Sequence, residues 1–445
     1  MNTARHLDEA RSQAVEVTRA LLEEDARIAK AVLVDDLFGR IRLILWAEAE
    51  DSIMDITPEI ASTLREKCGQ FWTGDIYIAN TGASPSDRAF HEAAWGAGRP
   101  VSESSKLRIN DRYRNRAAWF APPADPLWSG SEGSPLVAFH SFKGGVGRTT
   151  ALASYAIQRA RRGDHVAVVD MDLDAPGVGT LLDAGEGESA QWGVVDFMLE
   201  SKNNVALNDY HHRCTRLEVT HGEGAISVFP AGRVDREYLS KLARVDLEIS
   251  SSPVDHPFSR LLHRIRDELR PSVILIDSRA GLSPAAGLLL MGIAHAHVLF
   301  ATTNEQSLRG LALVVERLGG EYARRNLVQA DCIVVHAMVP DSAEIAALAS
   351  THFNMRVEDI FRDHYYAYVK DEKDDADDRL WTVRDLTDRD APHIGSPLGY
   401  RGKLAFFRDI DQIADVLASE KEYADLAARI DSRLDRLKVE ALQEP

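Results

Sequence analysis

The segment HSFKGGVGRTT, residues 140–150, places three glycines, two cations and two threonine hydroxyls in one short stretch. Glycines let consecutive backbone N–H groups turn inward around an anion, and a following helix presents its positive dipole end to the same charge. An apolar run precedes the segment, and a helix is expected from about residue 151 to residue 162. This order predicts a phosphate-binding loop, with a ligand-free strand-to-helix turn as the alternative.

The side chains of this loop each have a chemical use. Thr149 directly follows the cation Arg148, where a hydroxyl can ligate a phosphate-bound magnesium ion. Arginine keeps the charge of the lysine usual at such a position, but spreads it over a planar fork that grips two oxygens. Phosphate binding should therefore survive this exchange better than catalysis. The predicted backbone cradle consists of Gly144, Gly145, Val146 and Gly147.

Carboxylates follow two other apolar runs. The first run is followed by three aspartates at alternate positions, Asp170, Asp172 and Asp174. Such a cluster is costly unless it meets a cation or holds a water, so one or two of the three are predicted to face a magnesium-bound nucleotide. Asp277 ends the second run and is expected to order magnesium through water. The alternatives are an exposed acidic loop and a capping aspartate.

The elements that must position these residues alternate along the chain. Six apolar runs are predicted as strands, at 136–141, 165–170, 225–232, 272–278, 296–303 and 332–339. Continuous apolar strands between helices are typical of an α/β fold with a doubly wound, mostly parallel sheet covered on both faces. Ligands of such a sheet bind beyond the carboxyl ends of its strands, which is where the loop and the aspartates lie.

The N-terminal part of the chain follows a different pattern. A helix is expected over 7–31, a strand over 38–48, a helix over 57–69 and a strand over 74–80. We predict a smaller α+β module over 1–120 that binds a partner. Proline, glycine and serine in 121–135 indicate a linker, and 136–445 then forms the larger domain with C-terminal helices.

Composition narrows the function classes. A net charge of −17 over 445 residues argues against attraction of the whole surface to nucleic acid or anionic lipid. The three cysteines form no CxxC pair, which fits a reducing cytoplasm and offers no zinc or iron–sulfur signature. No stretch approaches the ~20 apolar residues of a membrane span. We expect a cytoplasmic protein.

Two further stretches are ambiguous. Residues 106–120 interleave basic and aromatic side chains, as a nucleic-acid contact would, but an acidic chain favours a solvated face paired with acids. Residues 410–442 carry apolar side chains at helical spacing. Their mixed charge favours packing against the body or a partner over membrane binding.

Three separated segments carry a family resemblance. KGGVGRTT, VVDMDLDAPG and ILIDSRAG together resemble the deviant Walker A ATPases of the ParA and MinD type, over roughly residues 135 to 340. That class also includes the arsenite-pump ATPase, nitrogenase iron protein and dethiobiotin synthetase. The resemblance implies ATP and Mg²⁺ as cofactors and a homodimer that contacts a protein partner.

The resemblance also assigns roles to matching positions. Lys143 corresponds to the signature lysine that reaches the nucleotide of the dimer partner, and Asp172 would orient the attacking water. Thr149 and Asp277 would hold magnesium, with Asp170 beside them, while Thr150 would contact phosphate. Arg148 takes the place of the family's loop lysine and its catalytic role.

This chain departs from the family pattern at two positions. Arg148 replaces the loop lysine, and Arg279 replaces a proline, either as a second cation facing the site or as a partner of one of the aspartates after the second strand. The KGGVGR loop resembles a variant subgroup of bacterial ATPases with extra domains in signalling or antiviral contexts.

We therefore predict slow ATP hydrolysis coupled to dimerisation. A non-hydrolysing regulatory scaffold is the alternative. A small-molecule ligase or metal-cluster carrier has less support, because the chain has no cysteine pair and its sequence shows no recognisable substrate pocket.

Overall fold

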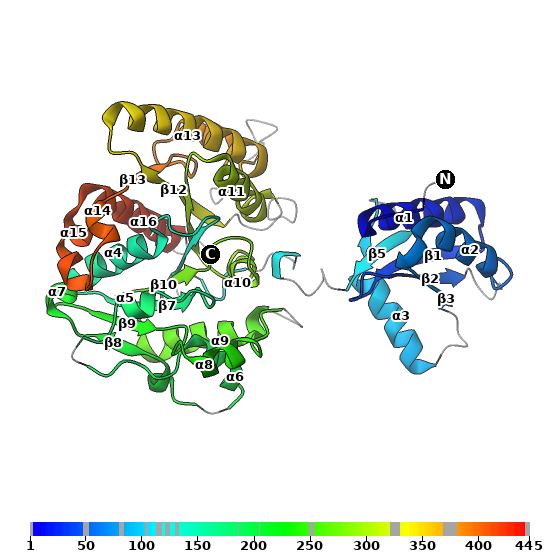
Figure 1. Cartoon of the computed structure of the whole chain (residues 1–445), viewed down its shortest axis with the longest axis horizontal. Coiled ribbons are helices and arrows are strands. Elements are labelled where there is room, and N and C mark those ends of the chain that lie inside the picture. Colours follow the sequence, from blue (N-terminus) through cyan, green and yellow to red (C-terminus); the bar gives the residue numbers. More distant parts are fainter. Residues whose placement is uncertain are drawn as a thin grey trace. The chain divides into compact units, whose positions relative to one another are not determined.

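The computed structural model describes residues 3–47, 53–79, 84–102, 106–112, 118–120, 125–129, 133–185, 187–203, 205–248, 253–320, 330–367 and 381–440. The chain forms two compact units, Met1–Phe120 and Ala121–Pro445, each with its own sheet (Figure 1). Among the described residues, no helix combines the length and the apolar character needed to cross a membrane.

The first unit is a five-stranded mixed sheet with helices on both faces. Its elements are α1 (Leu7–Glu24), β1 (Ile28–Asp35), β2 (Ile41–Ala47), α2 (Thr57–Cys68), β3 (Trp72–Ile78), α3 (Pro85–Ala97), β4 (Arg99–Pro100) and β5 (Leu107–Asp111). The strand order is β3-β2-β1-β5-β4. Apolar side chains of α1 and α2 pack on one face, and Ala94 of α3 packs on the other with Trp46. Because alternate strand residues face opposite sides, both faces acquire a core.

The second unit is an α/β domain built on an eight-stranded sheet. Its strands are β6 (Leu136–Ser141), β7 (His165–Met171), β8 (His212–Cys214), β9 (Ala225–Phe229), β10 (Val273–Ser278), β11 (Ala296–Ala301), β12 (Asp331–Val339) and β13 (Ser396–Gly399). The strand order is β13-β12-β11-β6-β10-β7-β9-β8. All neighbouring strands are parallel except β8 and β9, so the predicted mostly parallel sheet is confirmed.

Helices connect these strands and cover the sheet. They are α4 (Arg148–Arg161), α5 (Val178–Leu181), α6 (Val194–Glu200), α7 (Leu217–Thr220), α8 (Arg236–Leu242), α9 (Pro257–Arg264), α10 (Pro284–Leu289), α11 (Glu305–Leu318), α13 (Ala343–His364), α14 (Gly402–Ala405), α15 (Ala414–Ser419) and α16 (Lys421–Glu440). One sheet face packs against α4, α15 and α16 in a single apolar core. On the other side, α10, α11 and α13 contact β10, β11 and β12.

The apolar residues of the C-terminal stretch belong to this core. Leu417, Leu426, Ile430 and Leu434 are buried with the strands of the central sheet. The stretch therefore packs against the body of its own unit, as the sequence favoured, and its apolar face is not available to a membrane.

Some predicted boundaries were wrong. The helix expected over 7–31 ends at Glu24, and residues 28–35 instead form β1, because the apolar run AKAVLV alternates into both faces of the sheet. The short edge strands β8 and β13 were not predicted. Part of the segment predicted as a linker also packs within the second unit: the Trp128 indole donates to the Ser134 carbonyl at 2.9 Å, and the His295 imidazole lies 2.8 Å from the Trp128 carbonyl.

Candidate functional site

The order of the strands brings the predicted residues to one edge of the large sheet. β10 lies between β6 and β7, and Asp277 of β10 is in register with Phe139 on one side and Asp170 on the other. The loop after β6 and the aspartates after β7 therefore flank Asp277, although more than a hundred residues separate them along the chain. This is the carboxyl edge of parallel strands, where such sheets bind ligands.

The glycine loop has the backbone that its sequence predicts. Gly145 and Gly147 have φ values of +73° and +85°, in a region that residues with a Cβ rarely adopt. A Cβ placed on Gly144, Gly145 or Gly147 would meet no atom within 4 Å, so packing does not require these glycines. Open space in front of the loop leaves room for the approach of a phosphate.

The loop leads directly into α4. Gly147 is the residue before the helix, and its carbonyl accepts the first helical hydrogen bond, from the Ala151 N–H at 2.9 Å. The first N–H groups of a helix have no acceptor within it, and they carry the positive end of its dipole. Val146 is buried beneath the loop, and Thr150 is half-buried in the first turn. Loop and helix end together can hold phosphate oxygens.

Arg148 is the centre of the site. Its Nε donates to Asp277 Oδ1 at 2.6 Å, and its Nη2 donates to Asp172 Oδ2 at 2.9 Å. A third bond runs from Nη1 to the Ser141 hydroxyl at 3.2 Å. Arg148 is only 7% exposed. The guanidinium thus bridges the two carboxylates that the sequence analysis assigned to different roles.

Asp277 is shared between two donors. Thr149 donates its hydroxyl hydrogen to Asp277 Oδ2 at 2.6 Å, so each oxygen of this buried carboxylate accepts a hydrogen bond. Burial raises the pKa of Asp277, and the charge of Arg148 acts in the opposite direction. Burial by itself would lower the pKa of Arg148, but the two carboxylates outweigh it and raise that pKa. Arg148 therefore stays charged.

Asp170 lies deeper than the sequence implied. Its oxygens accept hydrogen bonds from the backbone N–H groups of Asp172 and Gly177, each at 3.1 Å, and so fix the turn after β7. Burial and the nearby charge of Asp277 raise the pKa of Asp170 well above its usual value. Tyr238 supports the same turn by donating to the Leu173 carbonyl at 2.7 Å. Asp170 holds the backbone that carries Asp172.

The remaining two cations lie apart from this cluster. Arg279 forms an ion pair with Asp174. Of the two alternatives for Arg279, this is the pairing with an aspartate after the second strand and not the second cation facing the site. Lys143 is half-buried in the loop, and no ion pair joins it to any residue that the structure describes.

The donor types fit magnesium. A threonine hydroxyl and aspartate oxygens are hard oxygen ligands, which Mg²⁺ prefers, alongside waters and phosphate oxygens. Within the described ranges, no group of three or more histidine, cysteine, aspartate or glutamate side chains forms a metal cluster by itself. These donors could hold a magnesium ion together with phosphate oxygens and waters.

Sequence reasoning missed two features of this site. It expected Arg148 to point at phosphate and did not foresee its pairing with both aspartates. It also missed Ser141, the last residue of β6, which is buried and accepts from Arg148. The position of Ser141, at the end of the strand that leads into the loop, could have identified it as a site residue.

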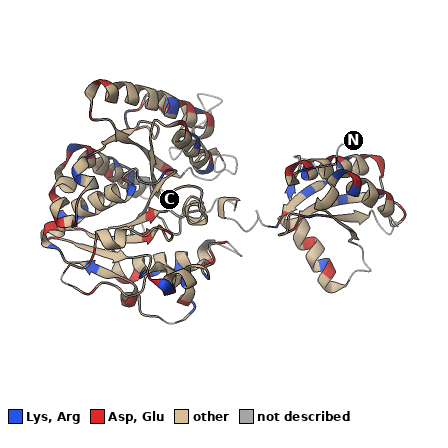
Figure 2. Cartoon of the chain, in the orientation of Figure 1, with Lys and Arg blue, Asp and Glu red and all other residues tan. Residues whose placement is uncertain are grey.

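The basic stretch is described only at 106–112 and 118–120; Tyr113, Arg114 and Arg116 fall outside the described residues. Arg108 lies over the Trp95 ring at 4.3 Å and donates to the Trp95 carbonyl at 2.9 Å. It therefore packs within the first unit. Figure 2 shows basic and acidic residues interspersed along the helices of each unit.

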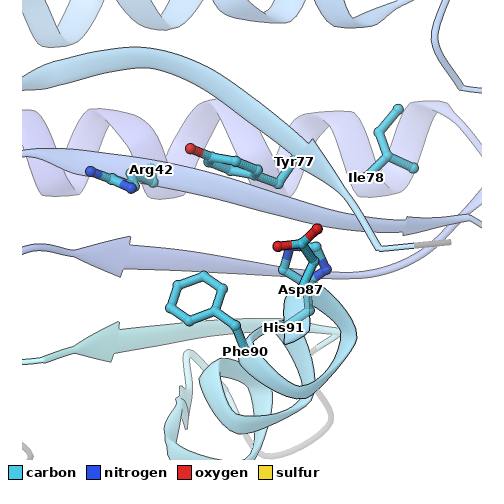
Figure 3. A pocket seen from close by; sticks show the side chains of 6 residues that line it. All are labelled: Arg42, Tyr77, Ile78, Asp87, Phe90 and His91. Atoms are coloured by element: carbon cyan, nitrogen blue, oxygen red, sulfur yellow. The ribbon is translucent and has the colours of Figure 1, made fainter. Parts of the chain in front are cut away.

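The first unit also has a hollow of about 390 Å³ beside α3. Figure 3 shows its lining, which is Arg42, Tyr77, Ile78, Asp87, Phe90 and His91. Asp87 is already engaged at the start of the helix, where it accepts from the Ser84 hydroxyl at 2.7 Å. His91 lies against the rings of Trp46 and Phe90.

Comparison with solved structures returns weak likenesses. The chain is 18% identical to pNOB8 ParA bound to nonspecific DNA, with a TM-score of 0.43, covering 68% of this chain and 99% of that one. It is 17% identical to the cell division ATPase MinD of Pyrococcus furiosus, with a TM-score of 0.41, and the match covers 67% of this chain and 99% of that one. It is 15% identical to MinD of Pyrococcus horikoshii complexed with Mg-ADP, with a TM-score of 0.41, and the match covers 68% of this chain and 97% of that one.

Comparison with curated proteins gives no match. A family model does match: the CobQ/CobB/MinD/ParA nucleotide binding domain, over residues 137–437. The matched segment begins in β6, includes the loop, Asp172 and Asp277, and ends within α16. Because the match extends over more than half of the chain, the protein belongs to the CobQ/CobB/MinD/ParA nucleotide-binding domain family.

Proposed function

We propose that this protein binds ATP with magnesium, hydrolyses it slowly and uses the cycle to control its own dimerisation. One observation carries the proposal: the glycine loop, Arg148, Thr149 and two aspartates converge at the carboxyl edge of β6, β10 and β7. An open cradle of N–H groups beside hard oxygen ligands suits a magnesium-bound triphosphate.

Each residue has a proposed role. The backbone of Gly144 to Gly147 and the start of α4 would hold the β- and γ-phosphates, with Thr150 contacting them. Thr149 would ligate magnesium directly and Asp277 through water, while Asp170 supports Asp172 from below. When bound, the metal would neutralise charge on the phosphate oxygens. Asp172, the more accessible of the two paired carboxylates, would orient the attacking water.

Arg148 would set the rate. Its flat guanidinium holds two oxygens at once and cannot act as a compact charge at the β/γ bridge. Transition-state stabilisation depends on close placement of charge, so a loss of ~3 kcal/mol would slow hydrolysis roughly a hundredfold. We therefore propose turnover well below that of a chain with lysine at this position.

The charge of Lys143, unpaired among the described residues, is the basis for proposing a dimer. Its ammonium makes no ion pair within the described chain and would reach the nucleotide of the partner subunit. ATP would favour the dimer by binding it better than the monomer, and hydrolysis would reset the population. The dimer would present a surface to a protein partner through the first unit, in bacterial signalling or antiviral defence and in the cytoplasm. A nucleic-acid partner is less favoured because the chain is acidic.

One observation supports a second function. Arg148 is bonded to both aspartates that hydrolysis would use. If the guanidinium never leaves them, the protein is a nucleotide-binding scaffold without turnover.

Phosphate release from ATP and magnesium separates these functions. We would compare the full chain with Asp172→Ala and Asp277→Ala, and with Asp174→Ala as a control, because Asp174 pairs with Arg279 outside the cluster. Turnover that is lost in the first two variants and kept in the third supports the enzyme. ATP binding without phosphate release supports the scaffold, and the absence of ATP binding rejects both.

A further inference from the structure

The guanidinium of Arg148 occupies the position between two carboxylates that a metal ion would need. It spans Asp277 Oδ1 and Asp172 Oδ2, at 2.6 and 2.9 Å, and Ser141 accepts from its third nitrogen. A pair of carboxylates at the edge of a buried sheet requires a positive counter-charge. Here the chain supplies that charge itself.

A hydrogen bond between Thr149 and Asp277 occupies the other oxygen atoms that a metal would need. Thr149 Oγ1 lies 2.6 Å from Asp277 Oδ2, so hydroxyl and carboxylate bond to each other directly. Magnesium needs near-octahedral oxygen ligands at about 2.0–2.1 Å, and it usually keeps several waters. A metal and its waters cannot be placed between these groups while Arg148 bridges the aspartates, and two cations in contact would also repel.

Phosphate oxygens offer Arg148 an equivalent partner. A guanidinium binds phosphate with the same forked geometry that it uses for carboxylates. Arg148 is the first residue of α4 and directly follows the glycine loop, so its side chain starts from the predicted phosphate cradle. Moving it from the aspartates to a phosphate, while a metal takes its place, keeps the charge around both carboxylates balanced.

We propose that Arg148 competes with the divalent metal for Asp172 and Asp277, and that the phosphates of a nucleotide release these aspartates by drawing the guanidinium away. This inference rests on the proposed nucleotide site and adds its regulation. Metal binding is weak without nucleotide and strong with it. By linkage, metal strengthens nucleotide binding by the same factor.

The experiment measures Mn²⁺ binding to the full chain by electron paramagnetic resonance, without nucleotide. Arg148→Met removes the competing cation and keeps a long apolar side chain. We expect Mn²⁺ to bind this variant at least tenfold more tightly than the wild type. Arg279→Met is the matched control, because it removes a nearby cation of equal charge that pairs only with Asp174 among the described residues. Its Mn²⁺ affinity should stay within about twofold of the wild type.

ADP provides the second arm. Adding ADP to the wild type should raise its Mn²⁺ affinity at least tenfold, and should raise that of Arg148→Met much less. Equal Mn²⁺ affinity of wild type and Arg148→Met without nucleotide overturns the competition. A similar gain in Arg279→Met also overturns it, since general electrostatics would then explain both.

Two checks keep the outcomes distinct. Circular dichroism tests whether the variants fold. If Arg148→Met unfolds, Arg148→Lys replaces it. One ammonium cannot span both carboxylates, so the lysine variant should have a Mn²⁺ affinity between those expected for the wild type and for Arg148→Met. If ADP does not bind the wild type, the proposed function fails, while the comparison without nucleotide still decides the competition.

Discussion

The hydroxyl of Thr149 and the carboxylate of Asp277 are joined by a 2.6 Å hydrogen bond, across 128 positions of the chain. One residue comes from the start of a helix and the other from the end of a buried strand, so their contact depends on the packing of α4 against β10. The pair links the phosphate loop to the centre of the sheet.

Thr149→Val should remove metal-dependent nucleotide affinity. Valine has a similar shape but no oxygen, so ADP binding should lose most of its dependence on magnesium, by about tenfold or more in Kd at saturating metal. Calorimetric titration of ADP with and without Mg²⁺ measures this. Thr149→Ser keeps the hydroxyl and should restore the dependence; equal metal dependence in valine and wild-type proteins would contradict the assignment.

Arg148→Lys should accelerate hydrolysis. Lysine returns a compact charge to the loop and loosens the hold on Asp172 and Asp277, so we expect the rate of phosphate release to rise roughly ten- to a hundredfold. Single-turnover kinetics with saturating ATP and Mg²⁺ provide the measurement. A slower lysine variant would show that the guanidinium itself takes part in the reaction, and an unchanged rate would show that Arg148 does not set it.

Stability should fall as the pH drops below about 6.5, the ordinary histidine pKa. Burial, first, and the charge of Arg148 lower the pKa of His140 to about 3, and burial lowers that of His297 to about 3. Between these values the unfolded chain binds protons that the folded chain does not, so unfolding becomes easier as pH falls, by up to about 1.4 kcal/mol per pH unit for each histidine.

Urea unfolding between pH 7 and pH 4.5 tests this dependence. His297 is fully buried on β11, and His297→Leu should make the curve of unfolding free energy against pH shallower. The control is His352→Ala, at an exposed position on α13, which should leave the slope unchanged. Identical slopes in all three proteins would refute the role of the buried imidazoles.

Ile430→Ala should destabilise the second unit. The side chain is fully buried in the core shared by α16, α15 and α4, and such truncations cost about 2–5 kcal/mol of unfolding free energy. Met355→Ala, on an exposed part of α13, should change it by less than about 0.5 kcal/mol. The shift in the urea midpoint of the full chain distinguishes them. A neutral Ile430→Ala would mean that α16 is not part of the core.

The sequence predicted the large sheet well because its strands are continuous apolar runs. The bounds of β6 agree at both ends, and β7, β10, β11 and β12 agree within two residues. Two of the missed strands, β13 and β1, were missed for different reasons. β13 is only four residues long at the edge of the sheet, and β1 was hidden in an apolar run after a helix with no strong breaker between them.

The sequence analysis named Arg148, Asp172 and Asp277 as candidates, but it did not foresee that the structure joins them by hydrogen bonds. Residue types and strand ends identified Arg148, Asp172 and Asp277 because parallel strands bring their carboxyl ends together. The sequence does not contain the strand order, and the insertion of β10 between β6 and β7 sets the distance between these three groups. Side-chain direction also decides that Asp170 bonds the backbone while Asp172 bonds Arg148.

That strand order also fixes when the site can first exist. During synthesis, β6, α4 and β7 emerge early, but the space between the two strands is filled only after β10 has left the ribosome, about a hundred residues later. Contacts over such separations are slow to form. A nascent or truncated chain ending before β10 therefore has a glycine loop but no Asp277 to accept from Arg148 and Thr149.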